Sequence, residues 1–330
     1  MTRPLGIIGV PTSAGAFAPG QEQAPAALRR AGLIKRLRHA EIAVVDHGDG
    51  PLCRWRPDRE RPRAQNLALV VDQARSTADR VHEAVAAGEI PLVLGGDCTI
   101  ELGVVAGVVA AADRVGLIYL DKHADLNVPE AVPEGALDWM GMAHLLGEEA
   151  ATPELSRFGS RFPLLAADDV CLFGHRIERA TSWERDALAR LRLHAISDLD
   201  VAADPEGAAA LALTILAPGH DRLLVHFDVD AIDFTDAPLS EHTGRNEGLT
   251  LDQAMRALRV FVASPAFAAL TITELNPNHG EADGATLDRF VAGLVQAFAG
   301  SPRLTPPSPL TASEGAVAKS RQASKPPARA

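Results

Sequence analysis

The amino-acid sequence places metal-ligand side chains directly after a short apolar run. Residues 115–120 are apolar and bounded by polar residues, which is typical of a buried strand, and Asp121, His123 and Asp125 follow them. In an extended backbone these three side chains point to one face of the strand, while Lys122 points to the other. Two carboxylates and an imidazole at a strand end make half of a divalent-metal site. Such ligands suit manganese, zinc or iron better than calcium.

A second acidic pair of the same kind occurs later in the chain. Residues 223–227 again have the pattern of a buried strand, and Asp228 and Asp230 follow at a spacing of two, with Asp233 behind them. Either group alone is also compatible with ordinary loop residues after a strand. Together, two strands that deliver acids on the same face at their carboxyl ends are what a two-metal centre in an α/β sheet requires.

The elements that must position these residues alternate along the chain. Apolar strand-like runs and Ala- and Leu-rich helical segments follow one another up to about residue 300, which predicts one α/β domain over residues 1–300. The long polar loop of residues 234–248 should lie over the strand ends, where ligands bind in parallel sheets. We expect strands at residues 5–10, 42–45, 91–94, 115–120, 169–173, 223–227 and 268–273, and helices at about residues 26–38, 64–88, 100–112, 139–150, 185–193, 251–262 and 285–298.

Composition points to a soluble globular protein. The chain has 330 residues, 47% of them hydrophobic and 23% charged, which is enough for a large core. No apolar run approaches the length of a membrane span, and three cysteines without framework spacing lead us to expect a cytoplasmic protein. The net charge of −11 argues against nucleic acid as a partner and is consistent with a cationic small molecule.

Residues 301–330 are basic and rich in Pro, Ser and Ala, so we expect a disordered tail, with a basic interaction arm as the alternative.

The order of motifs resembles the ureohydrolase family, which comprises arginases, agmatinases and formimidoylglutamases. Residues 95–99, Gly-Gly-Asp-Cys-Thr, resemble the family's Gly-Gly-Asp-His-Ser motif, and residues 121–125 resemble its Asp-Ala-His-x-Asp motif. Residues 227–233 resemble Phe-Asp-x-Asp-x-x-Asp, residues 274–277 resemble Glu-x-Asn-Pro, and residues 9–11 resemble the family's opening. The resemblance covers essentially the whole predicted domain. It implies a three-layer α/β/α sandwich with a mostly parallel sheet.

The resemblance also implies a reaction and a ligand set. It implies a metal-dependent hydrolase that cleaves a C–N bond of a guanidino or amidino compound, through attack of metal-bound hydroxide on the planar carbon. Glu274 would bind the cationic guanidinium as a bidentate partner, and Asp125 is expected to serve both catalysis and metal binding. By the same resemblance we expect a homo-oligomer, either a trimer or a hexamer. The implied ligands of two Mn²⁺ ions, or of another divalent metal, are Cys98, Asp121, His123, Asp125, Asp228 and Asp230.

Cys98 stands where the family has a metal-binding histidine. A bound metal would itself deprotonate the Cys98 thiol. The resulting thiolate would be a ligand that adds a fifth anion, which weakens the metal ions as Lewis acids and raises the pKa of bound water. The alternative is a small buried thiol that packs as a hydrophobe, with one ligand lost. Lys122 replaces a small residue of the family motif, and we expect it to form an ion pair behind the metals; the alternative is a lysine that points toward the site and competes with metal.

The family's proton-shuttling histidine aligns with Met140, which cannot carry a proton. The alternatives in this sequence are His144, His175 and His242, of which we take His144 as the catalytic candidate; solvent is the other proton source. Arg245 lies in a predicted specificity loop and suits a carboxylate. The residues expected to bind the substrate are Asn127, Glu178, Arg245 and Glu274.

Two functions from different classes remain open. The first is a metal-dependent hydrolase of a guanidino compound, with an N-hydroxyguanidine such as hydroxyarginine as one expected substrate. The second is a non-catalytic protein of the same fold that binds a ligand or partner. The retained carboxylates favour the hydrolase, because they would repel one another in a site without metal.

Overall fold

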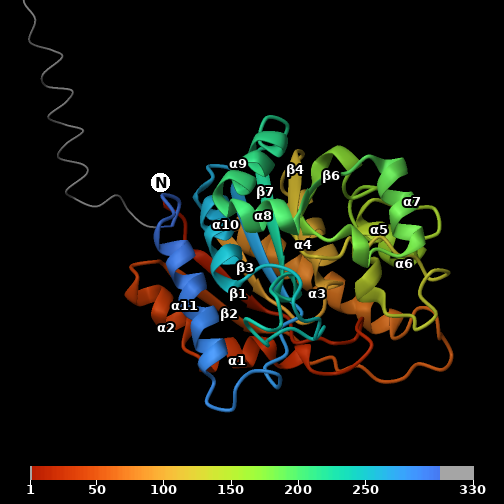
Figure 1. Cartoon of the computed structure of the whole chain (residues 1–330), viewed down its shortest axis with the longest axis horizontal. Coiled ribbons are helices and arrows are strands. Elements are labelled where there is room, and N and C mark those ends of the chain that lie inside the picture. Colours follow the sequence, from red (N-terminus) through yellow and green to blue (C-terminus); the bar gives the residue numbers. More distant parts are fainter. Residues whose placement is uncertain (1, 305–330) are drawn as a thin grey trace, which may run out of the picture.

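The computed structural model describes residues 2–304, which form one eight-stranded sheet with helices on both faces (Figure 1). All neighbouring strands are parallel, in the order β2-β1-β3-β8-β7-β4-β5-β6. This confirms the predicted three-layer α/β/α fold.

The strands are β1 (Leu5–Gly9), β2 (Val44–Asp49), β3 (Ile90–Leu94), β4 (Val115–Leu120), β5 (Val170–His175), β6 (His194–Ser197), β7 (Arg222–Asp228) and β8 (Phe267–Thr273). The α-helices are α1 (Ala24–Arg30), α2 (Leu33–His39), α3 (Leu67–Ala86), α4 (Ile100–Val109), α5 (Gly141–Leu145), α6 (Pro153–Ser156), α7 (Ser182–Leu191), α8 (Asp198–Ala203), α9 (Pro205–Leu216), α10 (Leu251–Ala263) and α11 (Ala285–Ala299).

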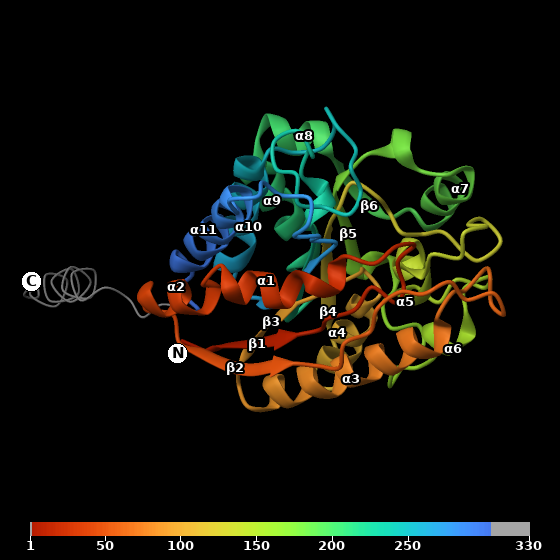
Figure 2. The same cartoon turned by 90° about the horizontal axis from the view of Figure 1, so that it is seen from below.

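Each face of the sheet has its own apolar core. On β1, Ile7 packs into the core shared with α1, α2 and α8–α11, whereas the neighbouring Ile8 packs into the core shared with α3–α7. In Figure 2, α1 and α2 accordingly lie on one side of β1 and β2, and α3 lies on the other. Because both faces are buried, the central strands are apolar at nearly every position instead of alternating. This is why continuous apolar runs predicted them.

Several elements differ from the sequence prediction. The helix expected at residues 26–38 is divided into α1 and α2 at Gly32, whose left-handed φ of 82° ends the first helix. The helix expected from Trp139 stops at Leu145, shortly before Gly147, which also has a positive φ. β6, α8 and α9 are additional elements. The search for apolar runs did not predict β6, because it is an edge strand in which His194 and Ala195 are exposed.

The folded part continues past residue 300. Ser301 Oγ donates to the carbonyl oxygen of Val262 at 2.6 Å, and Leu304 is buried in the core. Residues 301–304 therefore pack against the domain, and the rest of the expected tail lies outside the described residues. No helix within residues 2–304 is both long enough and apolar enough to span a membrane.

Candidate metal centre

The predicted functional residues gather at the carboxyl ends of four neighbouring strands. Cys98 follows β3, Asp121 follows β4, Asp228 ends β7 and Glu274 follows β8. A cavity opens over these strand ends, at the edge of a parallel sheet where binding sites are expected. Its lining consists of Phe17, Cys98, His123, Asp125, Asn127, Asp138, Trp139, Arg179, Thr181, Glu184, Asp228, Asp230, Glu241, His242 and Glu274.

The loop that carries Cys98 is held against the loop after β1. Asp97 accepts a hydrogen bond from the backbone N–H of Gly15 at 3.0 Å, and its own N–H donates to the Thr12 carbonyl at 3.2 Å. A Cβ on Gly96 would lie 1.5 Å from that same carbonyl oxygen, so only glycine fits there. The close approach of these two loops explains the glycine of the motif and fixes the position of Cys98.

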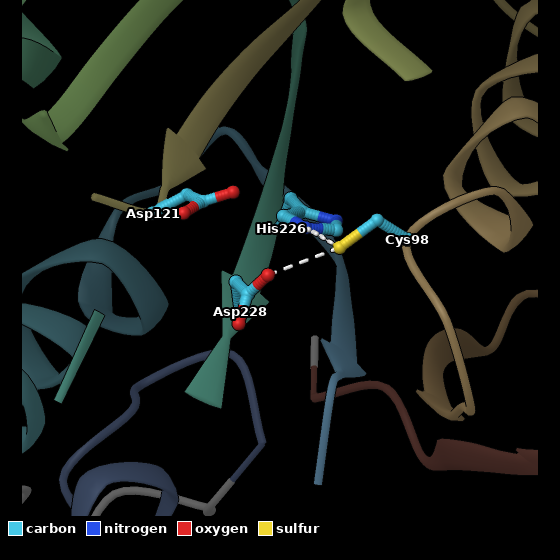
Figure 3. Close-up of side chains that lie close together, drawn as sticks. All are labelled: Cys98, Asp121, His226 and Asp228. Atoms are coloured by element: carbon cyan, nitrogen blue, oxygen red, sulfur yellow. Dashed lines mark hydrogen bonds between the residues drawn. The ribbon is translucent and has the colours of Figure 1, made fainter. Parts of the chain in front are cut away.

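Four buried side chains, which we call the inner cluster, lie close together (Figure 3). They are Cys98, Asp121, His226 and Asp228, and their ligand atoms lie within 4.8 Å of one another. Cys98 Sγ donates to Asp228 Oδ2 at 3.1 Å. His226 lies inside the apolar run of residues 223–227 and is not among the predicted ligands. Its spacing of two from Asp228 on a strand is the sequence signal that places both on one face.

Three further side chains, which we call the outer cluster, lie beside the first group. They are His123, Asp230 and His242, whose ligand atoms also lie within 4.8 Å of one another. His123 Nδ1 lies 3.1 Å from Asp230 Oδ2 and 3.5 Å from Asp121 Oδ1, so Asp121 connects the two clusters. His242 comes from the polar loop between β7 and α10, which covers the strand ends as expected.

The chain does not stay extended after β4, contrary to our expectation. The backbone N–H of His123 donates to Asp121 Oδ1 at 2.7 Å, which closes a tight turn, and Asp125 has a left-handed φ of 49°. The O–H of Tyr119 donates to Asp125 Oδ2 at 2.5 Å and holds that carboxylate. Asp121 and His123 therefore converge through a turn, and not by strand alternation. Asp125 lines the cavity beside the two clusters but belongs to neither.

Burial and mutual repulsion dominate the electrostatics of the inner cluster. Burial, followed by the charge of Asp230, raises the pKa of Asp121 and raises that of Asp228 well above its ordinary value. Burial and then Asp228 likewise raise the pKa of the Cys98 thiol. Burial also acts on Asp230, but the attraction of His123 and Lys122 outweighs it and lowers the pKa of that carboxyl.

The donor set fits a pair of divalent metal ions. Asp121 Oδ2 and Asp230 Oδ1 are buried and have no hydrogen-bond partner among the described residues. Unpaired buried carboxylate oxygens are costly, and a cation would satisfy them while removing the repulsion between the acids. Carboxylate oxygens, imidazole nitrogens and a thiol are all ligands for divalent transition metals.

Glu274 faces the cavity from the end of β8. It has a left-handed φ of 61°, and its two oxygens accept hydrogen bonds at 3.0 Å from Gln21 Nε2 and from the backbone N–H of Cys98. Burial, followed by the charges of Asp138 and Asp228, raises its pKa well above the ordinary value. A cationic group bound in the cavity would favour the carboxylate form of Glu274.

Lys122 forms the ion pair that its substitution in the motif led us to expect. Its side chain is fully buried, and Nζ lies 3.7 Å from Glu247 Oε1. Arg179, which lines the cavity, pairs with the other oxygen of Glu247. Glu247 therefore carries two cationic partners behind the outer cluster.

The expected proton carrier is not brought to the cavity. Both ring nitrogens of His144 are buried and lack a hydrogen-bond partner within residues 2–304, and burial lowers the pKa of the ring to about 4. His175 is also buried and, like His144, is absent from the residues that line the described cavity. His242 is the candidate histidine that lines it. The catalytic role predicted for His144 is therefore corrected, because its ring is enclosed.

The expected substrate-binding residues are only partly assembled. Asn127 lines the cavity and accepts a hydrogen bond from Thr181 Oγ1 at 2.7 Å. Glu178 is exposed on a 3₁₀ turn and Arg245 is exposed over an aromatic ring, and neither lines the described cavity. Glu184, which the sequence did not single out, lines it instead, because its capping interaction with Thr181 fixes it at the start of α7.

Comparisons with known proteins match this geometry. Residues 3–299 match the arginase family. The chain is 30% identical over 280 residues to arginase of Bacillus caldovelox, covering 83% of this chain and 91% of that protein. It is 30% identical over 285 residues to arginase-1 of Homo sapiens, covering 85% and 87% of the two chains. The solved structure of the Bacillus caldovelox arginase has a TM-score of 0.79 at 27% identity and covers 91% of this chain and 98% of its own. The chain therefore belongs to the arginase family, as its motifs predicted.

Proposed function

We propose that this chain hydrolyses a C–N bond of a small guanidino or amidino compound at a centre of two divalent cations. The observation that carries the proposal is the adjacency of the inner and outer clusters beneath one cavity. Asp121 joins them, since it belongs to the inner cluster and its Oδ1 lies 3.5 Å from His123 Nδ1. Membership of the arginase family supports the reaction class, because the relatives compared are arginases.

One cation would lie in the inner cluster and the other in the outer cluster, with the Asp125 carboxylate beside them. Mn²⁺ is the ion that the family resemblance suggests. A pair of divalent cations supplies Lewis-acid polarisation to such a site and lowers the pKa of water. The chain itself supplies the repelling carboxylates that attract these cations and the turns that hold the ligands in place.

Glu274 is the residue we propose to orient the substrate. Its buried carboxylate faces the cavity and offers a planar, charged acceptor to a planar guanidinium. Asp138 and Glu241 line the same cavity and offer further carboxyl groups to a cationic substrate. Asn127 and Glu184 lie on the α7 side of the cavity, where they would contact the remainder of the molecule.

The leaving group determines which guanidino compound reacts best. Met140 occupies the position of the family's proton carrier, His144 is enclosed, and His242 belongs to the outer cluster. A less basic leaving group needs less help from an acid. We therefore propose that an N-hydroxyguanidine such as Nω-hydroxy-L-arginine is a better substrate than L-arginine.

The test is a comparison of kcat/KM for L-arginine, agmatine, guanidino acids and Nω-hydroxy-L-arginine with protein reconstituted in Mn²⁺. We expect hydrolysis of at least one compound, fastest for the hydroxylated one, and loss of turnover in Asp228→Asn. Faster turnover of L-arginine than of its hydroxylated form would contradict the leaving-group argument. No turnover of any compound, with both metals bound, would contradict the hydrolase proposal and favour a non-catalytic binding protein.

A further inference from the structure

Two polar side chains, Glu101 and Tyr119, contact His226, which is a member of the inner cluster. Glu101, on the otherwise apolar α4, is 1% exposed, and His226 is fully buried. Glu101 Oε2 lies 3.2 Å from His226 Nδ1, and its other oxygen has no hydrogen-bond partner in the part of the chain described. The His226 ring stacks on Tyr119, with centroids 4.1 Å apart and planes 4° from parallel. Burying a carboxylate and an imidazole in a core is costly unless they are compensated.

The two nitrogens of His226 face different partners. When the Glu101 carboxylate accepts from Nδ1, the neutral ring keeps its lone pair on Nε2. Nε2 lies 3.5 Å from Cys98 Sγ and 3.2 Å from Thr273 Oγ1, so the lone pair points to the inner cluster. Figure 3 shows the ring of His226 and the sulfur of Cys98 turned toward each other. An imidazole whose second nitrogen is held by a carboxylate is the usual arrangement of a metal-binding histidine.

We propose that His226 is a ligand of the inner metal, oriented by Glu101, and that Cys98 and His226 make the inner position select zinc-like ions over manganese. This inference rests on the proposed metal centre but not on the proposed hydrolysis. His226 supplies the nitrogen that is missing at position 98; it comes from β7, which β8 separates from β3.

The spacing of the side chains supports this assignment. Zn–S and Zn–N bonds of about 2.3 and 2.0 Å at a tetrahedral angle would put sulfur and nitrogen roughly 3.5 Å apart. The separation of Cys98 Sγ from His226 Nε2 is 3.5 Å. Asp121 Oδ2, buried and unpartnered within residues 2–304, is available as a further ligand. One thiolate, one imidazole and two carboxylates suit zinc or cobalt, whereas manganese prefers oxygen.

Cys98, His226 and Glu101 could also be a nucleophilic cysteine, its general base and the acid that orients the base. The environment of Cys98 argues against a nucleophilic role. A reactive cysteine needs an electropositive, partly exposed environment. Cys98 is 2% exposed and donates to Asp228, and burial followed by this carboxylate raises the pKa of the thiol. A metal would deprotonate the thiol directly. The surroundings therefore favour a ligand.

A cobalt titration of the metal-free full-length protein tests the proposal. We expect the first equivalent of Co²⁺ to produce thiolate-to-cobalt charge transfer in the near ultraviolet and the strong visible bands of four-coordinate cobalt. Glu101→Gln should lower the affinity for that equivalent by about 10- to 100-fold, the usual effect of losing the partner of a ligand histidine. The double substitution Glu101→Leu/His226→Phe removes the pair without leaving a lone buried charge and keeps the ring stack on Tyr119. It should lower the affinity at least as much and alter the visible bands.

The matched control is His47→Phe/Glu89→Leu. This pair is also a histidine beside a carboxylate, with His47 Nε2 2.6 Å from Glu89 Oε2, and Glu89 precedes the amino end of β3, whereas Cys98 follows its carboxyl end. It should leave the cobalt spectrum unchanged.

Wild-type affinity and bands in both Glu101 variants, no thiolate band in the wild type, or rapid alkylation of Cys98 in metal-free protein would each overturn the proposal. If the double variant does not fold, Glu101→Gln decides. Hydrolysis is not a readout, so an inactive protein with the expected spectra would overturn only the proposed function.

Discussion

The ring of His242 meets the ring of His123 edge to face, with their centroids 5.3 Å apart. His123 follows β4, whereas His242 belongs to the loop between β7 and α10. Two segments far apart in the sequence thus bring imidazoles to Asp230, and the outer cluster depends on the conformation of the loop that covers it.

We expect His242→Ala to weaken Mn²⁺ binding at the outer cluster by about tenfold or more, because it removes a ligand nitrogen and leaves the inner cluster intact. The measurement is a Mn²⁺ titration in which electron paramagnetic resonance reports the free ion. His194→Ala, on the exposed edge strand β6, is the control and should bind like the wild type. Two unchanged equivalents in His242→Ala would remove this histidine from the ligand set.

Glu274→Gln should lower kcat/KM for the best guanidino substrate by roughly ten- to a hundredfold, because a hydrogen bond to a charged group contributes about 1.5–3 kcal/mol. The amide keeps the shape of the side chain and can still accept from the Cys98 N–H, so the metal content should not change. Glu178→Gln, at an exposed position outside the described cavity, is the control. Equal losses in both variants would show that Glu274 does not bind the guanidinium.

Much of the fold and most members of the two clusters could be predicted because both depend on strand ends. The central strands are buried on both faces, so their apolar runs are recognisable, and Asp121 and Asp228 follow such runs directly. The edge strand β6 and the Ala-rich α9 lack that signal. The turn after β4 could not be foreseen either, because it depends on tertiary contacts such as the hydrogen bond from Tyr119 to Asp125.

The two cluster residues that were not predicted as ligands, His226 and His242, lie where the sequence pattern gives little information. His226 sits inside an apolar run; its spacing of two from Asp228 places both on one face, but its contact with Glu101, 125 residues away in the chain, is not visible in the sequence. His242 lies in an irregular loop that periodicity does not describe. His144 seemed suited to carry a proton from its place near Met140, but the packing of α5 encloses its ring. Such outcomes depend on long-range packing.

His144→Leu should reduce the loss of stability that the protein suffers in acid. The folded-state pKa of His144 is about 4, below its ordinary value of 6.5. Above pH 6.5 the ring is neutral in both states and contributes nothing to the pH dependence. As the pH falls toward 4, the unfolded chain binds a proton that the folded chain does not, and stability is lost by up to about 3 kcal/mol.

Urea unfolding of wild type and His144→Leu at pH 7, 6, 5 and 4 measures this difference. The wild type should lose more stability than the variant across that range. His220→Leu is the control, because both ring nitrogens of His220 have partners, Leu216 O and Asp169 Oδ1. Parallel pH profiles for wild type and His144→Leu would mean that the ring is protonated in the folded state after all.

Elemental analysis of the metal bound per chain tests the two-metal centre most directly. The full-length protein is stripped of metal, equilibrated with a mixture of Mn²⁺ and Zn²⁺, and freed of unbound ions. The adjacency of the inner and outer clusters predicts two ions per chain in total, and about one or fewer in Asp121→Asn, because Asp121 joins the clusters. Well under one ion per chain in the wild type would contradict the metal centre.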